Sequence, residues 1–384
     1  MKARISPFWR RLSVFPVLNV LTSTSAGGKT LSMSGIAVAR HDLVPPCSVG
    51  GTGNLLTATS RSSWLAATTL ILATLLYPGM SWASPDDPGQ VQLSGPGLGT
   101  HDPTIVEVGG KFVRVQTGRG IPLAVSADLG RWELAGQVFT TNPPWTSERI
   151  PGSSDLWAPD LVLRGGEWRL YYSVSTFGSN RSAIGLAVNK HLNPDNPSVG
   201  WEDRGPVFES FSTDDYNAID PQIASDGASD WLVFGSFWGG IKMIPLNPDG
   251  TAAPDSLMVP LASRPEAPHA IEGAYIFRHG GKFYLFVSFD FCCRGKRSTY
   301  HIRVGRSDSF AGPYVDLDGK PLLEGGGTLV KTDDDRDLGP GHNSILVTGG
   351  KEYLVYHVYD GRYGGAPRLR IEELRWDQAG WPTP

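Results

Sequence analysis

Basic residues are scarce over most of this 384-residue chain. Seven of its 34 Lys and Arg residues and one of its 38 Asp and Glu residues lie in residues 1–83, which leaves 27 basic against 37 acidic residues and a formal net charge of −10 in the remainder. An excess of negative charge disfavours binding to phosphate backbones and anionic lipid surfaces. We therefore expect no nucleic-acid partner.

Charged residues are absent from residues 62–84. Within this stretch residues 64–77 are nearly all apolar, but the run is shorter than the roughly 20 residues that a membrane-spanning helix needs. Arg61 precedes it and small residues follow at 81–83, as in a secretory signal peptide. We predict a leader over residues 1–83, unstructured upstream of the apolar run, and a secreted product, extracellular or periplasmic, with no membrane attachment after processing. A retained anchor is the alternative.

Cysteine is rare, with three residues in the whole chain. Cys47 falls in the predicted leader, and Cys292 and Cys293 are adjacent. In an oxidising compartment these two can form a vicinal disulfide. The alternative is a pair of buried thiols at the end of a strand.

Glycine and proline are abundant, at 47 and 30 residues, which is typical of a globular protein with many turns and little long helix. One unit occurs five times: an apolar strand, a Gly-containing turn and a second apolar and aromatic strand, followed in most copies by a third apolar segment. The second strand begins nine or ten residues after the first position, as expected for a hairpin. The copies begin at Asp102, Ala158, Asp220, Glu272 and His342.

Five similar antiparallel sheets bury both faces only if they stack in a line or close into a ring. Copies spaced 52 to 70 residues apart, each with three or four strands, are typical of β-propeller blades. We predict an all-β fold, a single catalytic domain over residues 84–384 that forms a five-bladed β-propeller with blades starting near residues 102, 158, 220, 272 and 342. A β-sandwich is the alternative, but it does not explain a fivefold repeat.

The first positions of the five copies should meet at one mouth of the central channel. Asp102, Asp220, Glu272 and His342 would then form a cluster of ionisable groups that is costly unless it is used. Taken singly, an Asp before Pro is an ordinary turn residue. Clustered carboxylates serve acid and base catalysis, and glycoside hydrolysis uses such a pair. Aromatic residues that could stack on sugars lie at strand ends or in loops: Trp145, Trp157, Phe177, Phe237 and Trp238.

The motifs HDPTIV, SSDLWAPDLV, NAIDPQI, IEGAYIF and GPGHNSI resemble those of glycoside hydrolase family 43, in particular its endo-α-1,5-L-arabinanase branch. The resemblance runs from His101 to the C-terminus. It implies a five-bladed propeller and an inverting hydrolase that cleaves internal α-1,5-L-arabinofuranosyl linkages of arabinan, the side chain of pectin.

The resemblance also implies roles for the three acids. Asp102 would be the general base, Glu272 the general acid, and Asp220 would orient the acid and raise its pKa. The apolar neighbours of Glu272 agree with this assignment, because burial and nearby negative charge keep a carboxyl group protonated. Gly273 would leave room for substrate beside the acid.

The same resemblance implies four substrate contacts, Trp157, Phe177, Asn217 and Trp238. It places a calcium ion in the central channel, facing His342 and held largely through water, and no organic cofactor. Calcium prefers oxygen ligands, so the alternative is a histidine that only hydrogen-bonds a carboxylate.

Other activities share these acids. An exo-arabinanase, an α-L-arabinofuranosidase or a β-xylosidase of the same family would differ in loops and added modules. Because no further module follows the fifth copy, we favour the simple endo type, acting as a monomer. A carbohydrate-binding propeller without catalysis is the alternative from another class, and the presence of all three acids argues against it.

Overall fold

The computed structural model describes residues 89–253 and 256–383. The predicted leader and its apolar run at 64–77 lie outside the described residues. Within the described part, no helix has the length and apolar character needed to cross a membrane. Helical structure there is limited to α1 (Pro144–Arg149) and the short 3-10 helices η1 (Pro96–Leu98), η2 (Gly295–Arg297), η3 (Leu322–Glu324) and η4 (Gly361–Tyr363).

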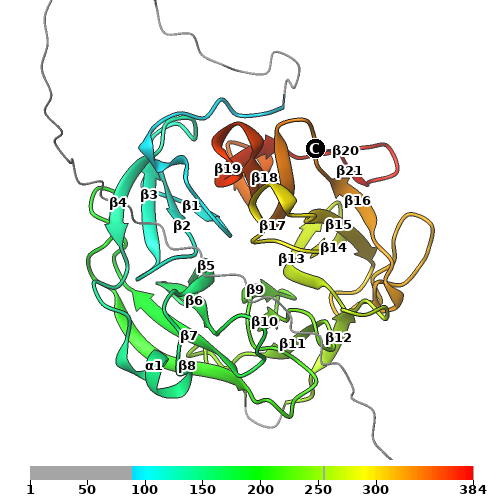
Figure 1. The fold of residues 1–384 in the computed structure, drawn as a ribbon, viewed down its shortest axis with the longest axis horizontal. Helices are drawn as coiled ribbons and strands as arrows, with labels where there is room; N and C mark the ends of the chain where they lie inside the picture. Colours follow the sequence, from blue (N-terminus) through cyan, green and yellow to red (C-terminus); the bar gives the residue numbers. More distant parts are fainter. Residues whose placement is uncertain (1–88, 254–255, 384) are drawn as a thin grey trace, which may run out of the picture. The chain divides into compact units, whose positions relative to one another are not determined.

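Five antiparallel sheets surround a central axis, so the predicted five-bladed propeller is confirmed (Figure 1). Blade one contains β1 (Thr104–Val108), β2 (Lys111–Val115), β3 (Pro122–Ser126) and β4 (Glu133–Gln137). Blade two contains β5 (Trp157–Arg164), β6 (Glu167–Val174), β7 (Ser182–Asn189) and β8 (Glu202–Ser210). Blade three contains β9 (Gln222–Ser225), β10 (Asp230–Phe234), β11 (Ile241–Pro245) and β12 (Val259–Ala262).

Blade four contains β13 (Ile271–His279), β14 (Lys282–Phe289), β15 (His301–Ser307) and β16 (Thr328–Lys331). Blade five contains β17 (Asp337–Thr348), β18 (Lys351–Asp360) and β19 (Ala366–Glu373), and a short ribbon of β20 (Arg375–Trp376) and β21 (Pro382–Thr383) follows it. In each blade the first strand lies innermost (Figure 1). Side chains alternate between the two faces of a strand, so each sheet packs on both neighbouring blades: Val113 and Val115 face the core with blade two, and Phe112 faces the core with blade five.

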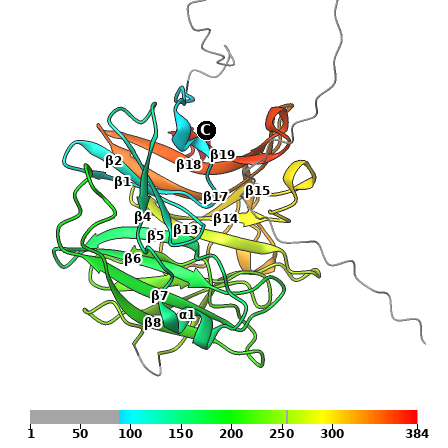
Figure 2. The same cartoon turned by 60° about the vertical axis from the view of Figure 1, so that its left-hand side comes forward.

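The first blade lies beside the fifth, which closes the ring (Figure 2). The chain before blade one runs along the outer edge of β19, where the N–H of Val91 donates to the carbonyl of Ile371 at 2.9 Å. The same segment reaches blade one, because the N–H of Trp132 donates to the carbonyl of Ser94 at 3.0 Å. Residues 89–100 therefore supply the fourth edge that the three-stranded sheet of blade five lacks.

Each innermost strand is preceded or interrupted by a left-handed residue at an equivalent position. These residues are Asp102, Ala158, Asp220, Gly273 and His342, with φ between 44° and 59°. Outside glycine this conformation is uncommon and costs of order 1–3 kcal/mol. In blade four the left-handed residue is Gly273, so the predicted equivalence of Glu272 with the other first positions is wrong by one residue. The Ile or Leu three residues later follows the same alignment, at Ile105, Leu161, Ile223, Ile276 and Ile345.

A second set of contacts, which we call the interblade ring, joins each blade to the next. In every blade the side chain two residues after the left-handed residue hydrogen-bonds the backbone of the following blade. The five side chains are Thr104, Asp160, Gln222, Tyr275 and Ser344. Ser344 completes the ring, since its hydroxyl donates to the carbonyl of Pro103 in blade one at 2.8 Å. The interblade ring holds the innermost strands at fixed positions around the channel.

Candidate active site

Three carboxylates from blades one, three and four meet at the channel mouth, as the repeat predicts. Asp102 and Asp220 are buried and Glu272 is partly buried. The groups are close enough for charge to act between them: the negative charge of Asp102 raises the pKa of both Asp220 and Glu272. Asp102 and Asp220 are the left-handed residues of their blades and Glu272 directly precedes Gly273, so the three acids occupy nearly equivalent positions around the channel.

Asp102 is surrounded by three histidines. Its Oδ1 lies 2.8 Å from Nδ1 of His101, 3.3 Å from Nδ1 of His342 and 3.5 Å from Nδ1 of His357. Its Oδ2 accepts a hydrogen bond from the hydroxyl of Thr117 at 2.5 Å. Burial alone would raise the pKa of Asp102, but the histidines outweigh burial and hold that pKa well below its usual range. Asp102 is therefore ionised.

The pKa values of the histidines around Asp102 shift in different directions. Burial acts to lower the pKa of His101, but the charge of Asp102 and the hydrogen bond to it outweigh burial and raise that pKa. Burial lowers the pKa of His342 and, more strongly, of His357, so both rings are neutral at pH 7. The ring of His101 stacks on that of His357 with centroids 3.9 Å apart.

Glu272 and Asp220 have the opposite electrostatic setting. Burial raises the pKa of Glu272 and the charge of Asp102 adds to it, against opposing hydrogen bonds from Ser236 and Tyr300. The Ser236 hydroxyl donates to Oε2 of Glu272 at 2.6 Å. Burial, then the charges of Glu272 and Asp102, raise the pKa of Asp220 well above its usual range. This pair of acids retains a proton under conditions where Asp102 has lost its own.

His342 fills the space next to Gly273. A Cβ on Gly273 would lie 3.1 Å from Nδ1 and 3.2 Å from Cα of His342. The expectation that Gly273 leaves room for substrate is therefore wrong, because that room is taken by a side chain and backbone of blade five. The backbone N–H of His342 donates to the hydroxyl of Ser288 at 2.8 Å, which fixes the residue in place.

The donor atoms can be tested against the expected calcium. Two groups in the described part of the chain bring three donors close together: His101 with Cys292 and Cys293, and His101 with Asp102 and His357. Neither contains His342. Calcium takes six to eight oxygen ligands, and a neutral His342 whose Nδ1–H faces Asp102 offers a single nitrogen, Nε2. The donors around His342 therefore do not fit a calcium ion enclosed by protein oxygens.

The model of the glycosyl hydrolases family 43 matches residues 98–382. The chain belongs to this family. It is therefore a glycoside hydrolase, and the predicted recognition of family 43 is confirmed.

Curated relatives support the assignment. The chain is 43% identical over 289 residues to an extracellular endo-α-(1→5)-L-arabinanase of Bacillus subtilis, which covers 74% of this chain and 87% of the relative. It is 40% identical over 334 residues to an extracellular exo-α-(1→5)-L-arabinofuranosidase of Cellvibrio japonicus, covering 83% and 91%. The solved structure of a Cellvibrio cellulosa α-L-arabinanase complexed with arabinohexaose is similar with a TM-score of 0.71 and 40% identity, covering 74% of this chain and 95% of that one.

The aromatic side chains expected to contact substrate in this family 43 enzyme lie in different settings. Trp157 and Phe177 pack together with ring centroids 5.0 Å apart, and Phe177 is 75% exposed. Trp238 is 36% exposed. Trp145, in contrast, packs against the buried Tyr172 and belongs to the core between blades one and two. Trp157, Phe177 and Trp238 therefore remain available to a ligand, and Trp145 does not.

Asn217 and Phe237 complete the set of predicted contact residues. Asn217 is 3% exposed, and its amide oxygen accepts a hydrogen bond from Ser182 at 2.6 Å. Its amide nitrogen has no hydrogen-bond partner within the described residues. The ring of Phe237 lies 6.0 Å from that of Phe291, between centroids. The structure thus brings Phe291 beside a predicted platform residue.

Several residues around the acids were missed from sequence. Their common feature is a polar side chain at the end of the second strand of a blade, aimed at the start of the next blade. The backbone N–H groups of Ala158, Asp220, His342 and Asp102 donate to such side chains, and in blade four the carboxylate of Glu272 accepts from one. The side chains are Thr117, Ser173, Ser288, His357 and Ser236. The serines in YYSVS, FGSF and FVSF are the signal that could have revealed them.

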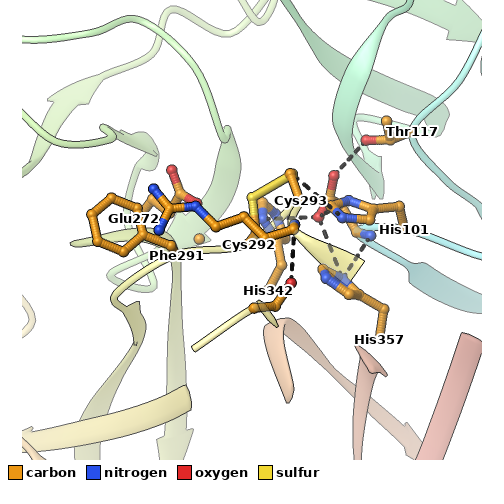
Figure 3. The surroundings of a disulfide bond; sticks show 12 residues. His101, Thr117, Glu272, Phe291, Cys292, Cys293, His342 and His357 are labelled. Atoms are coloured by element: carbon orange, nitrogen blue, oxygen red, sulfur yellow. Dashed lines mark hydrogen bonds and ion pairs between the residues drawn. A yellow bond between two sulfur atoms is a disulfide. The ribbon is translucent and has the colours of Figure 1, made fainter. Parts of the chain in front are cut away.

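Cys292 and Cys293 form a disulfide, which is one of the two predicted alternatives. The pair follows Phe291 and lies beside the histidines of the Asp102 cluster (Figure 3). Cys293 has a left-handed backbone, with φ 64°, and its Sγ lies 3.7 Å from Nε2 of His101. The disulfide is therefore part of the candidate active site.

Proposed function

We propose that this family 43 glycoside hydrolase is a secreted enzyme that cleaves internal α-1,5-L-arabinofuranosyl linkages of arabinan with inversion of configuration. The observation that carries the proposal is the contrast among three neighbouring carboxylates: the surrounding histidines hold the pKa of Asp102 below its usual range, whereas burial and nearby negative charge raise the pKa of Glu272 and of Asp220. An inverting glycosidase needs one carboxylate of each kind. The named activities of the Bacillus subtilis and Cellvibrio japonicus relatives support the α-1,5-arabinan substrate.

In the proposed mechanism Asp102 takes a proton from the attacking water. The oxygen of that water bonds to the anomeric carbon on one face of the arabinose ring while the bond to the departing glycosidic oxygen breaks on the other. Glu272 gives its proton to that oxygen, so the reaction ends with Asp102 protonated and Glu272 ionised. Proton exchange with solvent restores both groups.

Asp220 supports the acid in this proposal. Its Oδ2 accepts a hydrogen bond from the backbone N–H of Gly273 at 3.2 Å, which fixes the residue directly after Glu272. Its negative charge, when present, disfavours ionisation of Glu272. Both effects keep the acid protonated and correctly placed.

We propose that Trp157, Phe177 and Trp238 stack on arabinose units, since each is partly or largely exposed. The free amide nitrogen of Asn217 would donate to a sugar hydroxyl. A hydrated calcium ion beside His342 would supply positive charge that favours the ionised form of Asp102.

Exo action is the second candidate, and the Cellvibrio japonicus relative favours it because it covers more of both chains than the Bacillus subtilis relative. The time course of linear debranched arabinan digestion separates the two. Endo action predicts mixed oligomers and a rapid loss of viscosity at low conversion. Release of one short product from the chain ends, arabinose included, would contradict it. The same assay with an aryl arabinofuranoside or xyloside tests the α-L-arabinofuranosidase and β-xylosidase alternatives.

The inverting mechanism is tested separately by proton NMR of the first product. Inversion predicts that the β anomer appears before mutarotation. A non-catalytic binding propeller predicts no product from either substrate.

A further inference from the structure

We propose that Tyr359 and the Cys292–Cys293 loop are positioning elements for Asp102 and act on it through His101. The inference rests on the proposed function, because it takes Asp102 as the general base. The contacts form a continuous chain. The backbone N–H of Cys293 donates to the hydroxyl oxygen of Tyr359 at 2.7 Å, that hydroxyl lies 2.6 Å from Nε2 of His101, and Nδ1 of His101 lies 2.8 Å from Oδ1 of Asp102.

The direction of these hydrogen bonds follows from chemistry. A backbone N–H only donates, so the oxygen of Tyr359 accepts from Cys293 and faces His101. When His101 is neutral, the Tyr359 hydroxyl donates to Nε2 and the ring proton resides on Nδ1. When His101 is protonated, both nitrogens carry protons and Nε2–H donates to the oxygen of Tyr359. In both states an N–H at Nδ1 points to Asp102.

Stacking alone does not fix this arrangement. The ring of His101 lies flat on that of His357, with an interplanar angle of 27°, and such a contact restrains the plane of the ring. A flip of the ring about its Cβ–Cγ bond keeps the plane but replaces Nδ1 by a carbon beside Asp102. The hydroxyl of Tyr359 distinguishes the two orientations, because only one of them places Nε2 against it. Tyr359 therefore selects the orientation in which Asp102 is hydrogen-bonded.

The disulfide fixes the position of the Cys293 N–H, the first donor in this series of hydrogen bonds. A bond between adjacent cysteines restricts the backbone that joins them, and Cys293 is held in the left-handed region. Tyr359 lies on β18 of blade five, 66 residues from Cys293 in the sequence. The loop between β14 and β15 of blade four and the second strand of blade five thus meet at one hydroxyl, and both contribute to the position of Asp102 in blade one.

The test compares Tyr359→Phe with Tyr353→Phe as a control. Tyr353 lies on the same strand and the same face of β18 and is outside the chain of contacts. We expect Tyr359→Phe to lower kcat by about 10- to 100-fold with little change in KM, since general-base catalysis contributes about 10²- to 10⁴-fold. The loss should be equal on arabinan and on an aryl α-L-arabinofuranoside, because water attack is common to both. Tyr353→Phe should retain full kcat.

Azide gives a readout that a purely structural role would not change. It attacks the anomeric carbon without needing a base, so it forms the carbon–nitrogen bond as the glycosidic bond breaks and Glu272 protonates the leaving oxygen. Azide should therefore restore turnover of the aryl substrate by Tyr359→Phe, giving the β-glycosyl azide. Cys292→Ser should show the same pattern with a smaller loss, because the backbone N–H of Cys293 remains.

Three results would overturn the inference: full kcat for Tyr359→Phe, a loss confined to arabinan, or a loss that azide does not relieve. Asp102→Asn distinguishes its failure from failure of the proposed function. If Asp102→Asn is inactive and Tyr359→Phe is normal, Asp102 is the base and Tyr359 does not position it. If Asp102→Asn turns over normally, the proposed base itself is wrong.

Discussion

The backbone N–H of Gly273 donates to the carboxylate of Asp220 across the junction between blades three and four. Gly273 directly follows Glu272, so a side chain of one blade fixes the backbone that carries the proposed acid of the next. This contact gives Asp220 two separable contributions, its charge and its hydrogen bond.

Asp220→Asn and Asp220→Ala separate these contributions. An asparagine oxygen can still accept from Gly273, whereas alanine removes both effects. We expect both variants to lose at least about 10²-fold in kcat on arabinan, with the larger loss for alanine. Wherever Asp220 is ionised, its charge disfavours ionisation of Glu272. Without that charge Glu272 should titrate at lower pH, and the basic limb of the kcat/KM profile should move to lower pH in both variants. An unchanged basic limb would show that Asp220 does not influence the ionisation of the acid.

Ser236→Ala tests an effect of opposite sign on the pKa of Glu272. The hydrogen bond from Ser236 stabilises the ionised form of Glu272 and lowers its pKa. Without it that pKa should rise further, so the basic limb of the kcat/KM profile should move to higher pH. Ser288→Ala, which removes a matching serine in blade four that faces His342, is the control and should leave this limb unmoved.

Glu272→Gln should lower turnover of arabinan by roughly 10³-fold or more. An aryl arabinofuranoside with a good leaving group needs little proton transfer, so its loss should be much smaller. Near-normal turnover of arabinan would remove Glu272 as the acid.

Gly273→Ala should be destabilising for two reasons, the left-handed backbone and the approach to His342. Gly110→Ala is the matched control, because Gly110 is also left-handed, with φ 77°, and a Cβ there meets no atom within 4 Å. We expect about 1 kcal/mol for the control and a further loss of about 1–2 kcal/mol at Gly273, measured by urea unfolding. Equal losses would mean that His342 moves aside freely.

Stability should also depend on Asp160, a member of the interblade ring. Burial raises its pKa to about 6, against a hydrogen bond from Ile223. The folded protein then binds this proton more tightly than the unfolded chain, so stability falls as pH rises from about 4 to 6 and stays lower above that range. Asp160→Asn keeps an acceptor for Ile223 and should remove this decrease. The stability of the variant relative to wild type should therefore be greater at pH 7 than at pH 4, by up to about 3 kcal/mol. A parallel pH profile for both proteins would contradict this account.

Removal of divalent metal tests the role of His342. We expect a chelator to lower kcat and calcium to restore it, with His342→Ala insensitive to both. A wild-type enzyme that is indifferent to chelation would leave His342 as a partner of Asp102 alone.

The fold could be predicted from the sequence because the repeat is local. Each hairpin is encoded by its own strands and turn, as in Gly109–Gly110 with φ 56° and 77°, and five copies imply a ring. The offset at Glu272 arose because the left-handed position is occupied by Asp, Ala, Gly or His, so residue type does not identify it. Only the backbone conformation does.

The site was predicted in part for the same reason. Asp102, Asp220 and Glu272 begin or precede innermost strands, where an ionisable group is conspicuous in the sequence. His101 and His357 are far apart in the sequence and stack only because the ring closes. The space beside Gly273 is likewise set by His342, a contact between blades four and five that no local pattern contains.

Because the interblade ring is closed, catalytic activity depends on every contact that joins one blade to the next. Strand content depends on hairpins within single blades, whereas the separation of Asp102 from Glu272 depends on joints between blades, including that of Ser344 with Pro103. A molecule opened between blades five and one would keep its circular dichroism and lose its turnover. Activity should therefore decline before secondary structure during heating, and the gap between the two curves measures how easily the ring opens.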